Sequence, residues 1–81
     1  MEFTQKYLTA DPVGDLSCQE AWTFFEEIAQ AGELPPMGKA TFLCELPVVI
    51  ESVYNIRKCH HILRSGRRVR GFRGVDIRMD A

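Results

Sequence analysis

The stretch Ser65–Arg78, SGRRVRGFRGVDIR, decides which fold is predicted. It contains five arginines and three glycines, and its apolar residues alternate with charged ones. One face of an extended chain would carry Val69, Val75, Ile77 and Met79, and the other Arg68, Arg70, Asp76 and Arg78. This alternation favours a β-hairpin over a disordered basic tail, with Gly71 and Gly74 around the reversal. Phe72 and Arg73 would then lie near the tip of the hairpin.

The composition is that of one small globular domain spanning residues 1–81. Of the residues, 46% are hydrophobic and 10% aromatic, which argues against a disordered chain. No apolar run approaches the roughly 20 residues of a membrane-spanning helix, and the first residues lack the basic and hydrophobic regions of a signal peptide. We therefore expect a cytoplasmic protein with no membrane partner.

The charges are distributed unevenly along the chain. Residues 1–56 carry two basic and nine acidic side chains, a net charge of −7, whereas residues 57–81 carry eight basic and two acidic side chains, a net charge of +6. This asymmetry indicates an end that faces a polyanion on an otherwise acidic body. An internally neutralised surface is the alternative interpretation.

The residue types that carry catalysis or bind metals show no distinctive spacing. Cys18, Cys44 and Cys59 cannot all pair and form no C-x-x-C motif, which argues against a disulfide framework and a zinc ribbon. The run Cys59–His61 would not converge on one ion from a helix, because adjacent helical side chains point about 100° apart. No phosphate loop or nucleophile elbow is present. The sequence predicts no cofactor, no metal site and no enzyme.

Two helices are predicted before residue 50. Ser17 followed by Glu20 is a capping-box pattern, and apolar residues then recur at helical spacing up to Gly32, which is placed to end the helix. The segment ELPPMGK, residues 33–39, interrupts the helical pattern because of its two prolines. The segment KATFLCEL, residues 39–46, predicts a short helix that ends at Pro47.

The third helix is expected at about residues 50–64, closed by Gly66. Val53, Ile56 and Leu63 would lie on its apolar side. The opening residues EFTQKYL alternate and are compatible with an extra N-terminal strand. The predicted fold is thus α+β: a small winged helix-turn-helix domain of three helices followed by a C-terminal β-hairpin wing.

Three segments resemble known winged helix-turn-helix DNA-binding domains. LSCQEAWTFFEEIA, at residues 16–29, is similar to the first helix of response-regulator effector domains. IESVYNIRKCHHIL, at residues 50–63, is similar to their recognition helix, and VRGFRGVDIRM, at residues 69–79, to their closing hairpin. Modules of the sugar-operon repressor and biotin-repressor type share much of this pattern. The resemblance extends over roughly residues 16–79.

The resemblance implies a recognition helix at about residues 50–64 that enters the major groove of double-stranded DNA. Asn55 would read adenine, while Arg57 and Lys58 would contact phosphate or guanine. Ser52 and Tyr54 would position phosphates.

The hairpin at residues 67–78 would be the DNA-binding wing. Arg73 would enter the minor groove, where narrow A·T tracts concentrate negative potential. Arg67, Arg68 and Arg70 would contact backbone phosphates, so that affinity would fall steeply with salt.

The expected function is therefore a sequence-specific DNA-binding transcriptional regulator. One small module has a limited footprint, so we expect a homodimer on two half-sites. The alternative is a small adaptor or inhibitor, encoded by a phage or mobile element, that uses the same fold to dock another protein. Its acidic N-terminal half would then offer the protein-binding surface.

Overall fold

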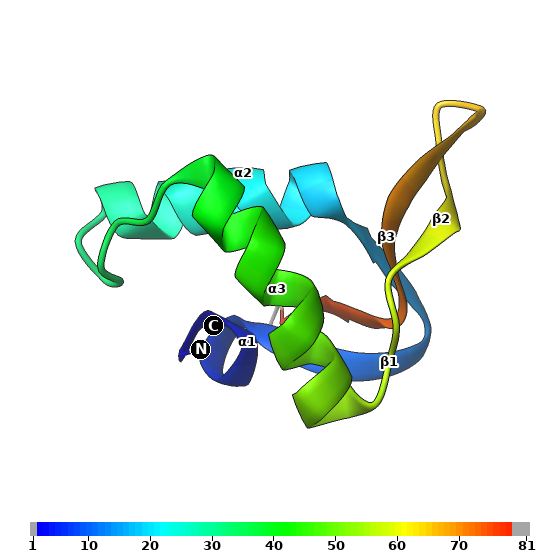
Figure 1. The fold of residues 1–81 in the computed structure, drawn as a ribbon, viewed down its shortest axis with the longest axis horizontal. Helices are drawn as coiled ribbons and strands as arrows, with labels where there is room; N and C mark the ends of the chain where they lie inside the picture. Colours follow the sequence, from blue (N-terminus) through cyan, green and yellow to red (C-terminus); the bar gives the residue numbers. More distant parts are fainter. Residues whose placement is uncertain (1, 79–81) are drawn as a thin grey trace.

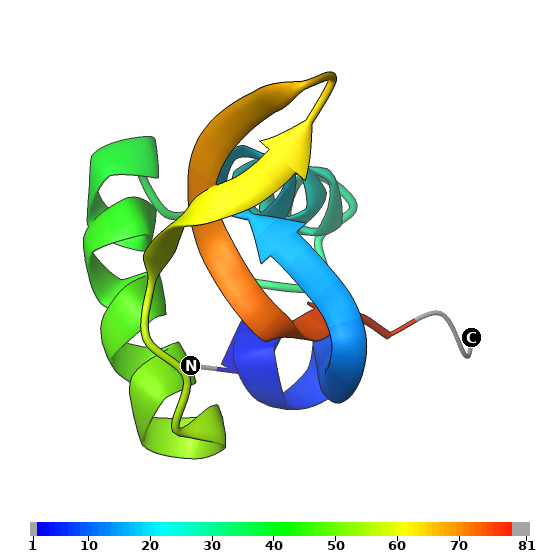
Figure 2. The ribbon, with the colours of Figure 1, turned by 90° about the vertical axis from the view of Figure 1, so that its right-hand side faces the viewer.

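The chain forms three helices and a three-stranded antiparallel sheet, as seen in a computed structural model that describes residues 2–78 (Figure 1). In order along the chain, the elements are α1 (Glu2–Tyr7), β1 (Leu8–Ser17), α2 (Cys18–Gln30), α3 (Lys39–Tyr54), β2 (Cys59–Arg64) and β3 (Arg67–Ile77). The strands are arranged β1-β3-β2, so β3 is central (Figure 2). The α+β class predicted from the sequence is confirmed, but the order of elements differs.

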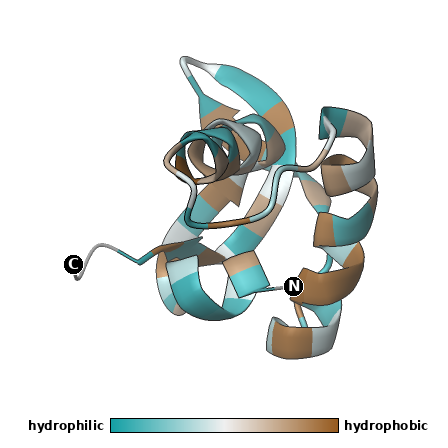
Figure 3. Cartoon of the chain, turned by 90° about the vertical axis from the view of Figure 1, so that its left-hand side faces the viewer, coloured by the Kyte–Doolittle hydropathy of each residue, from teal (hydrophilic) through white to brown (hydrophobic). Residues whose placement is uncertain are grey.

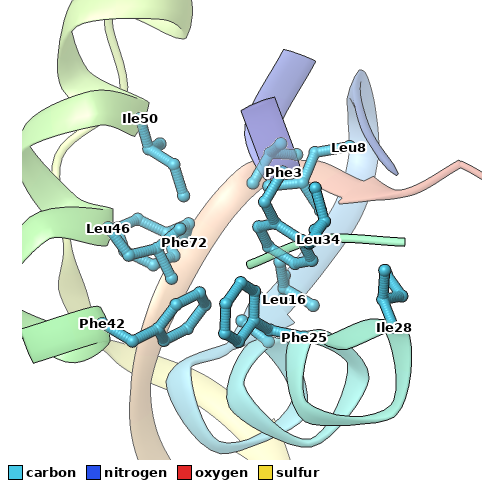
Figure 4. Packing of buried hydrophobic residues seen from close by; sticks show 12 residues of the cluster. Phe3, Leu8, Leu16, Phe25, Ile28, Leu34, Phe42, Leu46, Ile50 and Phe72 are labelled. Carbon is cyan, nitrogen blue, oxygen red and sulfur yellow. The ribbon is translucent and has the colours of Figure 1, made fainter. Parts of the chain in front are cut away.

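One hydrophobic core joins the three helices to the sheet (Figure 4). Phe3 of α1 meets Phe25 of α2 edge-on at 5.6 Å between ring centroids, and Phe25 stacks on Phe42 of α3 at 4.6 Å. Leu16 and Phe72, which are paired across β1 and β3, complete this cluster from the sheet. Aromatic side chains bury large apolar areas, which a domain of this size needs for stability.

The predicted start and end of α2 are confirmed. The Ser17 hydroxyl accepts a hydrogen bond from the Glu20 amide, and the Glu20 carboxylate accepts one from the Ser17 amide, each at 3.0 Å. These two bonds satisfy amide groups that a helix N-terminus otherwise leaves unpaired. Gly32 follows the C-cap residue Ala31 and takes a positive φ of 81°, as expected of a residue that ends a helix.

The prediction of a break at Pro47 and a helix over residues 50–64 is wrong. A single helix, α3, runs through Pro47 and ends where Asn55 takes a left-handed conformation, with φ 57° and ψ 39°. Proline inside a helix costs about 3 kcal/mol or more. The burial of Phe42, Leu46 and Ile50 on the same helix offsets that cost.

Residues 59–64 form strand β2 in place of the predicted helix. The helical pattern assigned Leu63 to the core, but its side chain is 61% exposed, whereas Ile62 is fully buried and pairs with Val69 of β3. Pairing with a neighbouring strand therefore outweighs the local helical pattern, because strand formation depends on packing against such neighbours.

The hairpin predicted within residues 67–78 is wrong, because residues 67–77 form the single strand β3. A C-terminal hairpin is present, but β2 and β3 form it, and its turn lies at residues 65 and 66. Ser65 and Gly66 form a two-residue loop with positive φ at both positions, the geometry that matches the twist of paired strands. Gly71 lies instead in the middle of β3, where a Cβ atom would collide with the Leu16 carbonyl oxygen. Phe72 is fully buried in the core rather than near a tip. Met79, expected on the apolar face, lies outside the described residues.

The N-terminal strand predicted over EFTQKYL is wrong, because residues 2–7 form α1. Phe3 and Tyr7 are four residues apart, a spacing that also places them on one side of a helix. Their rings lie 6.2 Å apart between centroids, and Phe3 is buried. The first strand, β1, begins only at Leu8.

Candidate nucleic-acid interface

The candidate interface is built on the hairpin of β2 and β3, which extends beyond the helices (Figure 1). Arg67 follows the turn directly, and Arg68 and Arg70 come next along β3; all three side chains are exposed. Arg68 and Arg70 are two residues apart, so they project from the same face of the strand. Within residues 2–78, none of these three arginines forms an ion pair.

Arg73 does not lie at the tip of the hairpin, where the sequence placed it. It occupies the middle of β3 opposite Asp15 of β1, and its Nη2 donates a hydrogen bond of 3.1 Å to the His61 carbonyl oxygen. The residue of the predicted wing nearest the turn is Arg67.

Arg64 ties the hairpin to α2 and β1. Its Nε and Nη2 donate to the two carboxylate oxygens of Glu20 at 2.8 and 2.9 Å, and Nη2 also donates to the Asp15 carboxylate at 2.7 Å. The hydrogen bonds from Arg64 lower the pKa of Glu20 to about 2. Bonds to both carboxylates raise the pKa of Arg64. The charge of Arg64 is therefore compensated inside the protein.

Sequence reasoning missed Arg64 as a residue that positions the interface. Its partners are 44 and 49 residues away in the chain. No local pattern contains that pairing, because it depends on how β2 lies against the start of α2. The capping-box pattern identifies Glu20, but only as a helix cap.

An open groove of about 830 Å³ lies between the beginnings of α2 and α3 and the hairpin. Its polar lining includes Lys39, His60, Arg68 and Arg70, together with the paired Glu20 and Arg64. Lys39 donates a hydrogen bond of 3.2 Å to the Gln19 side chain. Burial raises the pKa of the Cys18 thiol in this groove, while the positive charges of Lys58 and Arg70 act in the opposite direction. One helix, α3, and two strands, β2 and β3, thus bring basic side chains together around one groove.

The residues predicted to read DNA from a helix over 50–64 do not share one helical face. Ser52 and Tyr54 belong to the last turn of α3, Asn55 is its C-cap, and Arg57 and Lys58 lie in the connection to β2. Arg57 pairs with Glu51 at 3.2 Å, with both side chains largely exposed. This part of the predicted site is therefore dispersed, whereas Arg67, Arg68 and Arg70 lie together on β3.

The Tyr54 hydroxyl bonds to the backbone of the protein. Its hydroxyl lies 2.9 Å from the Thr4 carbonyl oxygen and 3.1 Å from that of Leu8, where α1 meets β1. A phenol has one O–H to donate, so the two carbonyl oxygens share it. The hydroxyl predicted to position a phosphate is therefore bonded within the protein.

The described residues, 2–78, contain no group of three or more His, Cys, Asp or Glu side chains that could hold a metal ion. His60 and His61 are consecutive on β2, where the pairing with β3 shifts register, and both side chains are exposed. No helix in the same part of the chain is long and apolar enough to cross a membrane.

Comparisons with known proteins add no relative. The chain matches no family model, no curated protein and no solved structure.

Proposed function

We propose that the protein is a DNA-binding transcriptional regulator of the winged helix-turn-helix class. Two consecutive helices, α2 and α3, joined by residues 31–38, are followed by the basic hairpin of β2 and β3, and this order supports the proposal. In this proposal α3 takes the place of the recognition helix that the sequence predicted at residues 50–64. The hairpin is the wing.

The observation that carries the proposal is the set of uncompensated cations on the hairpin. Arg67, Arg68 and Arg70 are exposed, and none has a carboxylate partner among residues 2–78. Unpaired arginines on a projecting element suit a ligand with regularly spaced negative charges. The phosphate backbone of double-stranded DNA is such a ligand, and arginine binds phosphate through several donors at once.

The exposed face of α3 limits how much sequence this module would read. Lys39 and Thr41 can offer hydrogen bonds from its first turn, but Glu45 and Glu51 follow on exposed positions. Carboxylates are repelled by phosphates unless they accept from a cytosine amino group. Binding would therefore be dominated by backbone contacts, and a homodimer on two half-sites would supply further specificity.

The test is fluorescence anisotropy of a labelled random-sequence duplex, titrated with the protein from low to physiological salt. We expect a micromolar dissociation constant. The logarithm of the association constant should fall linearly with the logarithm of the salt concentration. Arg68→Ala should lower the steepness of that line by about 0.9, because one phosphate contact is lost. Lys6→Ala on α1 removes the same charge at the end of the molecule away from the hairpin, and should change neither affinity nor slope (Figure 1).

Absence of binding even at low salt would overturn this proposal. The second candidate, an adaptor or inhibitor that docks another protein, would then be preferred. The exposed surface of α3 favours it, because Val48 is 67% and Val53 47% exposed, and apolar residues recur on successive turns (Figure 3). A pull-down that loses its partner on Val48→Asp, but not on Arg68→Ala, would identify α3 as the docking surface.

A further inference from the structure

The groove between α2, α3 and the hairpin contains more positive charge than its acidic lining neutralises. Glu20 is the only carboxylate among the described residues that line it, and both of its oxygens are bonded to Arg64. Lys39, Arg68 and Arg70 are therefore left without a carboxylate partner in the groove. A concave, cationic site of this kind attracts an anion.

The cations come from separate walls of the groove. Arg68 and Arg70 project from β3, whereas Lys39 lies at the start of α3 and is held toward α2 by its bond to Gln19. That bond uses one of the three donors of the ammonium group, so two remain for a ligand. Each guanidinium adds up to five donors in a planar fork that suits phosphate oxygens.

The ion pair between Arg64 and Glu20 sets the width of the groove, and an anion can bind without breaking it. Arg64 clamps β2 to Glu20 at the first turn of α2, directly beside the groove. Near this turn, the amides of Ser17 and Glu20 are already bonded within the capping box. The lysine and the two arginines, and not the helix terminus, therefore supply the attraction.

We propose that this groove is a binding site for one phosphate group of the DNA backbone, held by Lys39, Arg68 and Arg70. The proposal rests on the DNA-binding function proposed above and assigns it a specific contact, separate from that of Arg67 at the turn. The phosphate would fix the beginnings of α2 and α3 against one strand while the hairpin follows the duplex.

The experiment is an NMR titration of the full chain with two probes, inorganic phosphate and a short random-sequence duplex. We expect inorganic phosphate to shift the amide signals of Gln19 and of residues 68–70 in a saturable manner. Lys39→Ala should abolish those shifts, and its matched control Lys6→Ala should leave them intact. Arg70→Ala serves as a second variant from the other wall. The side chains of Lys39 and Arg70 are exposed, so we expect both variants to fold. A spectrum that is unchanged before titration, apart from the signals next to the substitution, verifies the fold.

The duplex separates this proposal from the proposed function. If it binds and Lys39→Ala lowers the salt dependence by about 0.9 while Lys6→Ala does not, the groove contacts a backbone phosphate. If it binds equally well to both lysine variants, the groove assignment is overturned and DNA binding stands. If no duplex binds while inorganic phosphate still shifts the groove signals, both the DNA-binding function and the backbone contact are overturned. The site would then belong to a small phosphorylated compound.

Discussion

Arg64 on β2 donates hydrogen bonds of 2.8 and 2.9 Å to the two carboxylate oxygens of Glu20 on α2. Because Arg64 directly precedes the hairpin turn, this pair fixes the angle at which the arginine-bearing hairpin leaves the helical part of the molecule. It also uses Glu20 a second time, since the same carboxylate caps α2.

Arg64→Ala should lower the free energy of unfolding by about 1 kcal/mol. The pair is partly exposed, with 33% of the Arg64 and 43% of the Glu20 side chain accessible, so screening by solvent reduces its contribution. Urea denaturation would measure the effect. Arg57→Ala is the matched control, because its pair with Glu51 is more exposed and should contribute less. Equal losses from the two variants would contradict a clamping role for Arg64.

Stability should depend on pH through Glu20. Its pKa is about 2 in the folded chain and 4.5 in its ordinary state, because hydrogen bonds from Arg64 favour the ionised form. The contribution of the carboxylate is therefore complete above about pH 4.5 and is lost as the pH falls toward 2. Comparing the melting temperatures of the wild type and Glu20→Gln between pH 6 and pH 2 checks this. We expect the difference between them to shrink with acidification, and a constant difference would refute the assignment.

Gly71→Ala should disrupt the centre of the sheet. The new methyl group would meet the Leu16 carbonyl oxygen and would lie 2.8 Å from both Ile62 Cγ1 and Ser17 Cα, so backbone would have to move. We expect a loss of about 1–3 kcal/mol or more in unfolding free energy. Gly38→Ala is the control, since its added Cβ meets nothing within 4 Å. A wild-type melting temperature for Gly71→Ala would show that β1 and β3 are not packed this closely.

Local signals in the sequence predicted α2 well, because its cap and its end depend on residues close together in the chain. Ser17, Glu20 and Gly32 each act within three or four residues of their partners. The extended conformation of residues 67–77 also follows from their alternating pattern, but the reversal predicted within them is wrong. Gly71 and Gly74 suggested a reversal, whereas Gly71 is needed for the close approach of β1.

The region after Ile50 could not be predicted in the same way. Residues 59–64 have apolar spacing compatible with a helix, and only pairing with β3 makes them a strand. The left-handed Asn55 that ends α3 is a weak signal, since asparagine also occurs inside helices. The hairpin arginines of the candidate site were found because they are consecutive in sequence, whereas the contribution of Lys39 to the groove required the fold.

Tyr54→Phe should reduce stability without changing DNA binding. The hydroxyl serves the Thr4 and Leu8 carbonyl oxygens, and its removal leaves partly buried acceptors without this donor. We expect a loss of about 1 kcal/mol in unfolding free energy. Ser52→Ala is the control, because its exposed side chain makes no hydrogen bond to residues 2–78. A lower affinity for the duplex in folded Tyr54→Phe would instead support the phosphate contact predicted from the sequence.

Arg67 and Arg73 should differ in what they contribute to DNA binding. Arg67 follows the turn and, under the proposed function, would be the residue to enter a minor groove, whereas Arg73 lies in mid-strand and bonds to the His61 carbonyl oxygen. We therefore expect Arg67→Ala to weaken binding to A·T-flanked duplexes more than to G·C-flanked ones, because narrow A·T grooves attract arginine. Arg73→Ala should weaken both equally or leave both unchanged. Competition anisotropy with the two duplexes measures these affinities for both variants. A loss specific to A·T-flanked duplexes for Arg73→Ala alone would instead support Arg73 as the residue that enters the minor groove.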